Sequence, residues 1–214
     1  MNSAILLAGG IGSRFGSSTP KQFVSLKGKL LILHSFEKLV KSLYIDEIII
    51  VCQKKYEKLF ECEKILKFAR PGQERQQSVY NGLKLATGDY VVVHDGARPL
   101  FSLKSMEKAI EAAKQNGASA LAVPVTSTIK KWDRSIKTVP RKNLWEIQTP
   151  QVVRRSLFIK AFQFVIQNKV VVTDDLSVVE AFGHQPTLVE GNDENIKITR
   201  PIDLKVAGAL YDSL

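Results

Sequence analysis

Residues 4–16, with the sequence Ala-Ile-Leu-Leu-Ala-Gly-Gly-Ile-Gly-Ser-Arg-Phe-Gly, run from an apolar segment directly into a glycine-rich loop. A short apolar run that ends in glycines predicts a buried parallel strand followed by a sharp turn. Glycines let backbone N–H groups approach a ligand closely. Arg14 lies in this loop and Lys21 follows seven positions later, so the stretch predicts a cradle for phosphate oxygens.

Two better-known phosphate loops do not fit this stretch. The dinucleotide fingerprint G-x-G-x-x-G accepts Gly10 and Gly12, but Phe15 stands at its third position, and lysines occupy the region of the expected acidic residue. The P-loop pattern G-x-x-x-x-G-K-[ST] is absent. Glycines alone would also fit a strand-to-helix turn without a ligand, whereas Arg14 and the Pro-Lys-Gln run at 20–22 favour a phosphate site.

The composition suits one cytoplasmic α/β domain with a small excursion. The chain has 214 residues, of which 44% are hydrophobic, and no apolar run approaches the roughly 20 residues that span a membrane. The first apolar run is too short, and lacks the basic flank, for a signal peptide. Cys52 and Cys62 show no metal-ligand spacing, so we expect two free thiols in a reducing compartment.

The net charge of +10 fits nucleic acid, an acidic membrane surface or small anionic substrates. Lysines are scattered along the chain, and no aromatic-basic motif of the RNA-binding kind appears. We therefore expect solvated helix faces and a polyphosphate site, with no nucleic-acid or membrane partner. A non-catalytic nucleic-acid-binding protein is the alternative from another class, and it leaves the ordered Arg14, Lys21 and Asp95 unexplained.

A second polar cluster ends the run Tyr-Val-Val-Val-His-Asp-Gly-Ala-Arg-Pro at residues 90–99. The valines predict a buried strand, and ligands bind at the carboxyl ends of strands in open parallel sheets. Asp95 is therefore a candidate to contact a metal or substrate hydroxyls. His94 would support it, and Arg98 would order the loop through carboxylate or phosphate contacts. A purely structural Asp–Arg turn is the alternative.

A turn at Pro71-Gly72 predicts the start of a helix that carries Arg75 and Ser78 one turn apart, on one face. A helix N-terminus is a natural anion or nucleotide site, although a surface cap would look the same. Local patterns predict further helices at 30–40, 56–68, 105–116, 156–168 and 174–180, and strands at 47–52 and 120–125.

Residues 127–141 predict two short strands around an Asp-Arg-Ser turn. Such a hairpin is marginally stable by itself. Trp132 and its β-branched neighbours would be more stable when packed on a partner, so we expect an arm that meets a second subunit.

The ordered motifs resemble a known family. Leu-Ala-Gly-Gly-x-Gly-x-Arg followed by Pro-Lys-Gln resembles the nucleotidyltransferases that build CDP-alcohols and nucleotide sugars, and Val-His-Asp-x-Ala-Arg-Pro is specific to the 2-C-methyl-D-erythritol 4-phosphate cytidylyltransferase branch and its close relatives. The resemblance covers essentially the whole chain. It implies a single domain, 1–214, with a three-layer α/β/α Rossmann-like nucleotidyltransferase fold, a mainly parallel sheet and a protruding β-arm at about 126–142.

The resemblance also implies an activity. The family transfers CMP from CTP to 2-C-methyl-D-erythritol 4-phosphate in non-mevalonate isoprenoid precursor biosynthesis. It uses Mg²⁺ held mainly by the CTP phosphates, and it forms a homodimer with swapped β-arms. Catalysis would fall to Arg14 and Lys21. The nucleotide would be bound by Ala8, Gly9, Gly10, Gly12, Gly72, Gln73, Arg75 and Ser78. Substrate would be held by Asp95, Arg98, Thr128, Arg141, Thr173 and Lys197, with Asp95 also the possible metal ligand.

Two departures concern the arm, where Ser127 replaces the usual aspartate and Pro140 precedes the matched arginine. The matched groups remain, but their exact placement is left open. Ribitol-5-phosphate cytidylyltransferases share most of the motifs, and Gly9 is compatible with them. The segments at 96–99 and 191–201 look more like the methylerythritol branch.

Overall fold

The computed structural model describes residues 1–10, 15–16 and 19–213. Its centre is a seven-stranded sheet in the order β11-β7-β10-β6-β1-β4-β5. These strands are β1 (Asn2–Leu7), β4 (Glu47–Val51), β5 (Ile65–Ala69), β6 (Tyr90–Asp95), β7 (Ala118–Pro124), β10 (Trp145–Arg154) and β11 (Thr187–Glu190). Only the β10 pairings with β6 and β7 are antiparallel among the pairings of this described sheet. The mainly parallel sheet expected from the sequence is therefore confirmed.

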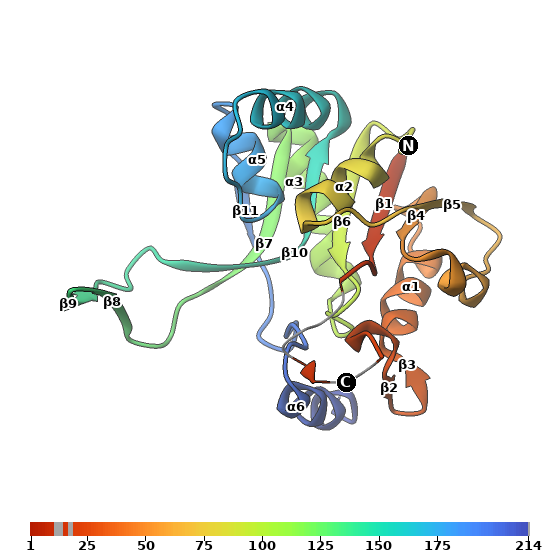
Figure 1. Cartoon of the computed structure of the whole chain (residues 1–214), viewed down its shortest axis with the longest axis horizontal. Helices are drawn as coiled ribbons and strands as arrows, with labels where there is room; N and C mark the ends of the chain where they lie inside the picture. The colour runs from red at the N-terminus through yellow and green to blue at the C-terminus, as the bar shows by residue number, and fades with distance from the viewer. Residues whose placement is uncertain (11–14, 17–18, 214) are drawn as a thin grey trace.

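Helices cover both faces of this sheet, because successive strand residues point to opposite sides. Leu6 and Val92 pack in one core with α1 (Leu31–Lys41) and α3 (Leu103–Asn116). Ile5 and Val93 pack in a second core with α2 (Arg75–Leu83), α4 (Arg155–Gln167) and α5 (Asp175–Ala181). Figure 1 shows the resulting three layers. Short elements η2 (Lys21–Phe23), β2 (Ser25–Leu26) and β3 (Lys29–Leu30) lead into α1, and α6 (Pro201–Tyr211) packs on Leu26.

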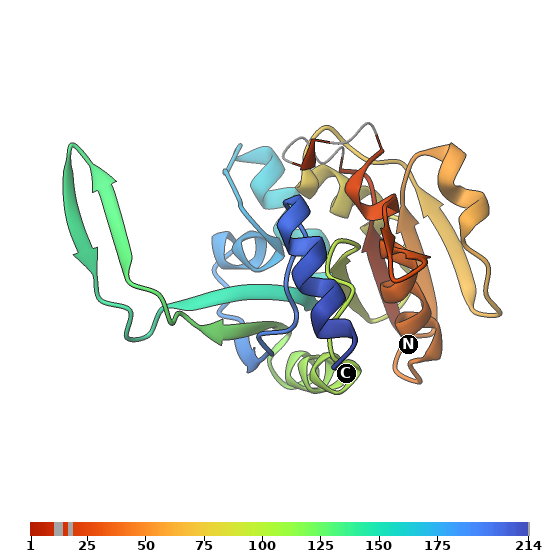
Figure 2. The same ribbon diagram turned by 90° about the horizontal axis from the view of Figure 1, so that it is seen from below.

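The expected arm is present. Strands β8 (Ile129–Asp133) and β9 (Ser135–Val139) form an antiparallel pair that stands away from the body (Figures 1 and 2). Trp132 faces Ile136 across the pair, and their exposed fractions are 82% and 63%. Large apolar side chains at this exposure bury little surface within the chain, so this arm gains little stability from its own contacts.

The expectation of one helix over residues 56–68 is wrong. The segment contains a short 3-10 helix, η3 (Lys54–Leu59), and the edge strand β5. Leu66 and Phe68 alternate toward the first core while Lys67 points to the other side, where it contacts Glu47. The charges at 61–64, which suggested a solvated helix, occupy the turn between the two elements. Pairing with β4 along the sheet edge outweighed local helix propensity.

Two other expectations can be compared with the described residues. Cys52 is buried and Cys62 is partly exposed, and neither forms a disulfide. Across the described parts of the chain, no helix combines the length and apolar character needed to cross a membrane.

The amino-terminal edge of the sheet holds a buried carboxylate, Glu47. It accepts hydrogen bonds from Ser3 Oγ at 2.5 Å, from Thr87 N at 3.0 Å and from Thr87 Oγ1 at 3.0 Å, and it pairs with Lys67. Burial raises the pKa of Glu47, but the hydrogen bonds from Lys67, Ser3 and Thr87 outweigh burial and hold that pKa below its usual value.

We expect Glu47→Gln to lower the free energy of unfolding by about 2 kcal/mol near neutral pH, because the buried donors lose their charged acceptor. Since the folded-state pKa is depressed, this stabilisation is present above about pH 5 and is lost as the pH falls through the folded-state value. Urea denaturation at several pH values measures it. Glu37→Gln, at an exposed pair with Lys29, is the control. A difference that stayed constant down to pH 3 would contradict this assignment.

Candidate active site

A cavity of about 590 Å³ opens at the carboxyl ends of β1 and β6. It collects residues from the glycine loop, η2, the start of α2, the turn after β6 and the segment before α6. The sequence-predicted residues among its lining are Gly9, Gly10, Lys21, Gly72, Gln73, Arg75, Ser78, Asp95 and Lys197. Most of the residues expected to bind the nucleotide, and some of those expected to bind the acceptor substrate, therefore line one cavity.

The other expected residues lie elsewhere. Ala8 is buried behind the loop, and Arg98 is buried behind the turn after β6. Thr173 is exposed next to Asp174, which caps α5 by accepting from Ser177 N at 2.9 Å. Arg14 and Gly12 lie outside the described residues.

The two arm residues lie at the root of the arm. Thr128 and Arg141 are exposed, and Arg141 donates to Thr126 O. Among the described lining residues of the cavity, none comes from the arm of the same chain. If the arm serves such a cavity, it therefore serves one on another subunit.

The glycine loop is held by Gln22, a residue of the Pro-Lys-Gln motif to which the sequence assigned no role of its own. Its Nε2 donates to Ala8 O at 2.6 Å and to Gly10 O at 2.7 Å, and the side chain is buried. Gly9 between them packs so closely on Pro71 that an added Cβ would lie 2.3 Å from Pro71 Cβ. The glutamine fixes the loop, and the glycine allows the loop to approach the start of α2.

Two lysines from opposite ends of the chain meet at one backbone segment. Lys21 Nζ donates to Ile198 O at 2.7 Å, and Lys197 Nζ lies 2.6 Å from Asp95 Oδ2. Ile198 N in turn donates to Ala97 O at 2.9 Å. The segment before α6 thus brings both ammonium groups to the end of β6.

Arg75 bridges two buried carboxylates. Its Nε donates to Asp95 Oδ1 at 3.1 Å, while Nη1 and Nη2 donate to the two oxygens of Asp175 at 3.1 and 2.8 Å. Burial raises the pKa of Asp95, but the charges of Arg75 and Lys197 outweigh burial and hold that pKa well below its usual range. Burial also raises the pKa of Asp175, and Arg75 opposes that rise. Asp95 is therefore an ionised acceptor of hydrogen bonds.

The start of α2 is ordered by side chains on its own first turn. Ser78 Oγ accepts from Gly72 N at 3.0 Å and donates to Glu74 O at 3.2 Å, and Glu74 forms a capping box with Gln77. Ser78 therefore shapes the turn that lines the cavity. The expected contacts of Arg75 and Ser78 with a nucleotide stay predictions.

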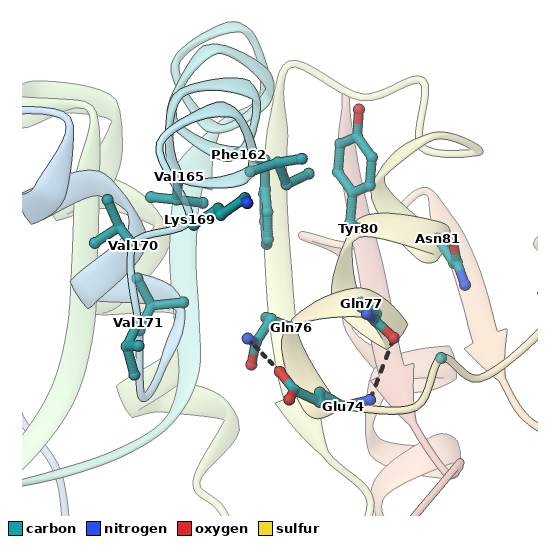
Figure 3. Close-up of a pocket in the computed structure, with 13 residues that line it drawn as sticks. Glu74, Gln76, Gln77, Tyr80, Asn81, Phe162, Val165, Lys169, Val170 and Val171 are labelled. Atoms are coloured by element: carbon teal, nitrogen blue, oxygen red, sulfur yellow. Dashed lines mark hydrogen bonds between the residues drawn. The ribbon is translucent and has the colours of Figure 1, made fainter.

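A second cavity, of about 500 Å³, lies on the other side of this turn. Figure 3 shows side chains of α2 on one side and those of α4 and its following loop on the other. The rings of Tyr80 and Phe162 are 5.2 Å apart, and Gln76 Nε2 donates to Glu74 Oε2 at 2.6 Å. Gly72 and Glu74 line both cavities, so the first turn of α2 is a wall between them.

Known proteins resemble this chain in sequence and in fold. A family model described as 2-C-methyl-D-erythritol 4-phosphate cytidylyltransferase matches residues 3–213. The chain is 45% identical to the chloroplastic enzyme of that name from Oryza sativa subsp. japonica, over 98% of this chain and 74% of the relative. It is 38% identical to the Chlamydia pneumoniae enzyme, over 98% of each.

Solved structures agree. The crystal structure of the Francisella tularensis 2-C-methyl-D-erythritol 4-phosphate cytidylyltransferase superposes with a TM-score of 0.86 at 34% identity, covering 97% of this chain and 98% of that one. The 4-diphosphocytidyl-2C-methyl-D-erythritol synthase of Anaerococcus prevotii gives 0.87 at 27% identity, covering 99% and 96%. The nucleotidyltransferase fold expected from the sequence is confirmed.

The Arg75–Asp175 pair can be tested by a double-mutant cycle in urea denaturation. We expect Arg75→Gln and Asp175→Asn each to lower the free energy of unfolding by about 3 kcal/mol, because each leaves a buried charged partner. The double variant should lose about 2 kcal/mol less than the sum of the single losses. Arg70→Gln and Glu57→Gln, at a more exposed pair, should add within about 0.5 kcal/mol. Additive losses at Arg75 and Asp175 would show that the two are not coupled.

Proposed function

The chain belongs to the 2-C-methyl-D-erythritol 4-phosphate cytidylyltransferase family, and from this membership we propose how its residues transfer CMP from CTP to 2-C-methyl-D-erythritol 4-phosphate. The products are 4-diphosphocytidyl-2-C-methyl-D-erythritol, a precursor in isoprenoid biosynthesis, and pyrophosphate. The observation that carries the proposal is that the glycine loop, Lys21, Arg75, Asp95 and Lys197 share one cavity at the carboxyl edge of the sheet.

The nucleophile is an oxygen of the acceptor phosphate. It attacks the α-phosphorus of CTP, the bond from that phosphorus to the bridging oxygen breaks, and pyrophosphate leaves with the electron pair. A phosphate monoester has a second pKa near ~6, so the acceptor is largely dianionic at neutral pH and requires no general base. Asp95, which is held ionised between Arg75 and Lys197, is suited to accept hydrogen bonds from substrate hydroxyls.

The barrier arises from bringing two polyanions together and from the charge that develops at the α-phosphate. Lys21 and Arg14 would stabilise that charge, since fixed cations in a site shielded from water act without reorganisation. Lys197, Thr173 and the partner's Arg141 would hold the acceptor phosphate in line. Because Lys21 bonds to the carbonyl next to Lys197, the nucleotide-side and acceptor-side cations converge on one segment.

A divalent cation would add charge neutralisation. The carboxylate of Asp95 is a hard oxygen ligand on the cavity wall, but both its oxygens already contact cations. No group of three or more His, Cys, Asp or Glu suited to a metal occurs within residues 1–10, 15–16 and 19–213. These residues fit Mg²⁺ that is held mainly by the CTP phosphates, with Asp95 as the protein's candidate ligand.

The alternatives are less well supported. The relatives quoted above are named for methylerythritol phosphate, and none of them for ribitol phosphate. We attribute the basic charge partly to solvated helix faces and partly to the polyphosphate site, so a nucleic-acid partner is not needed. We also propose a cytoplasmic location, where the unpaired thiols of Cys52 and Cys62 stay reduced.

Pyrophosphate release tests both the reaction and the role of Lys21. We expect release from CTP with methylerythritol phosphate, and much less with ribitol 5-phosphate. Lys21→Ala should lower kcat about a hundredfold or more while CTP affinity changes little, because one preorganised charge donor is lost. Lys29→Ala, at an exposed pair outside the cavity, is the matched control. Near-normal turnover by folded Lys21→Ala would remove this residue from the mechanism.

Subunit mixing tests the proposed swapped-arm dimer. If Arg141 acts on the partner's site, mixing Lys21→Ala with Arg141→Ala creates dimers with one intact site of two. Random exchange makes half the dimers mixed, so activity should return toward about a quarter of wild type. Lys21→Ala mixed with Lys197→Ala is the control, because both residues line one cavity and no intact site can form. If exchange is demonstrated and no activity returns, Arg141 acts within its own chain.

A further inference from the structure

Four buried residues close a ring of hydrogen bonds behind the cavity. His94 Nδ1 lies 3.1 Å from Thr149 Oγ1, and Thr149 O accepts from Asn195 Nδ2 at 2.9 Å. Asn195 O accepts from Arg98 Nη1 at 2.6 Å, and Arg98 O lies 3.0 Å from His94 Nε2. Their exposed fractions are 0% for His94 and Asn195, 4% for Thr149 and 7% for Arg98. None is among the described residues that line the cavity.

The direction of these bonds follows from their chemistry. Arg98 O can only accept, so His94 Nε2 carries the hydrogen. His94 is fully buried, and an imidazole that carries its one hydrogen on Nε2 presents Nδ1 as an acceptor. The Thr149 hydroxyl must then donate to Nδ1, and its oxygen accepts the Asp95 N–H at 3.1 Å. One hydroxyl therefore joins His94 to the backbone of Asp95.

The ring connects two loops that carry charged groups of the cavity. His94 and Arg98 flank the turn with Asp95, and Asn195 lies two residues before Lys197. Gln148 strengthens the connection, because its Oε1 accepts from Asn195 Nδ2 at 3.0 Å and its Nε2 donates to Asn192 O at 2.9 Å. The position of Lys197 relative to Asp95 thus depends on buried hydrogen bonds as well as on their own ion pair.

We propose that His94, Thr149 and Asn195 are positioning residues for the acceptor side of the site. Thr149 is the joint between its two loops, because its hydroxyl bonds to His94 and Asp95 and its carbonyl accepts from Asn195. The inference rests on the proposed cytidylyl transfer. Without this hydroxyl, two buried groups, the Asp95 N–H and His94 Nδ1, lose their partner. A shift of about 1 Å at Asp95 or Lys197 would misplace the sugar phosphate and cost roughly a hundredfold in rate.

The kinetic test compares two substitutions of one residue. Thr149→Val keeps the shape and removes the hydroxyl, and Thr149→Ser keeps the hydroxyl. For Thr149→Val we expect kcat/KM for the sugar phosphate to fall roughly 10- to 100-fold, with a higher KM for it and CTP affinity within about twofold. Thr149→Ser should stay within about threefold of wild type.

Ser119→Ala is the matched control, because Ser119 Oγ is also buried in the sheet and donates to Ala109 O at 2.6 Å, away from the ring. It should lower stability and leave the kinetic constants unchanged. The proposal fails if folded Thr149→Val keeps the wild-type constants for the sugar phosphate. It also fails if CTP affinity falls as much as acceptor use does, since that pattern indicates a general loss of structure. An inactive wild-type protein would instead overturn the proposed function.

A second measurement needs no variant at the ring. Nitrogen NMR of labelled wild-type protein reports the tautomer of each histidine, and His34→Gln and His184→Gln assign the remaining signal to His94. We expect His94 to carry its hydrogen on Nε2 and to have no hydrogen on Nδ1. Finding the hydrogen on Nδ1 would mean that the Thr149 hydroxyl does not donate to the imidazole of His94, and the proposal would be wrong.

Discussion

The buried charge of Asp95 is the constraint on which the rest of the site depends. A carboxylate in this position is stable only when cations meet it, and Arg75 and Lys197 do so from two different parts of the chain. Arg75 can reach Asp95 in this orientation because Asp175 holds its other side. The charges of α2, α5 and the segment before α6 are therefore assembled around β6 before any substrate arrives. A substrate phosphate that binds Lys197 must compete with Asp95, which frees a carboxylate oxygen for substrate hydroxyls.

The two ends of the strands in the central sheet have different roles. The amino ends hold a buried charge that contributes to stability, and the carboxyl ends hold the charges of the candidate site. Glu47 at the amino edge is surrounded by fixed partners from β1, β5 and the residues after α2, and none of them lines the cavity within the described chain. The carboxyl edge holds the charges of the proposed site, whose partners would be exchanged for those of a substrate. In an open parallel sheet only this second edge gathers the loops that bind ligands. Substitutions at Glu47 and at Lys197 should therefore affect different properties of the protein.

The sequence predicted the parts of this arrangement that are local. Strands β1 and β6 were recognisable because their apolar runs end in the glycine-rich loop and in the His-Asp-Gly-Ala-Arg-Pro motif. The arm was recognisable from its Asp-Arg-Ser turn. Strand β5 was missed because it lies at the sheet edge behind a charged turn, so its pairing with β4 had no local signature. The role of Asp175 depends on a guanidinium 100 residues away, and Gln22 acts through backbone carbonyls. Neither contact leaves a pattern in neighbouring residues. Arg98 was expected to order the loop through carboxylate or phosphate contacts and to hold substrate. Its guanidinium donates to the backbone of Asn195 behind the cavity, and its contact with substrate stays a prediction.

Residues 195–199, which lie near the carboxyl-terminal end of the sequence, complete the candidate site. Both large cores form from strands and helices that precede it, whereas Ile198 packs in the smaller third cluster with Leu26 and Leu100. Its contact with Lys21 joins residues 177 positions apart. Contacts of such sequence separation carry a large loop-closure cost, so they form most readily on a scaffold that is already folded. Local opening of this segment would separate Lys197 from the end of β6 and remove the acceptor of Lys21, while leaving both cores packed. Since such opening needs no unfolding of the domain, we expect the buried ring beneath this segment to bear on substrate use more than on global stability.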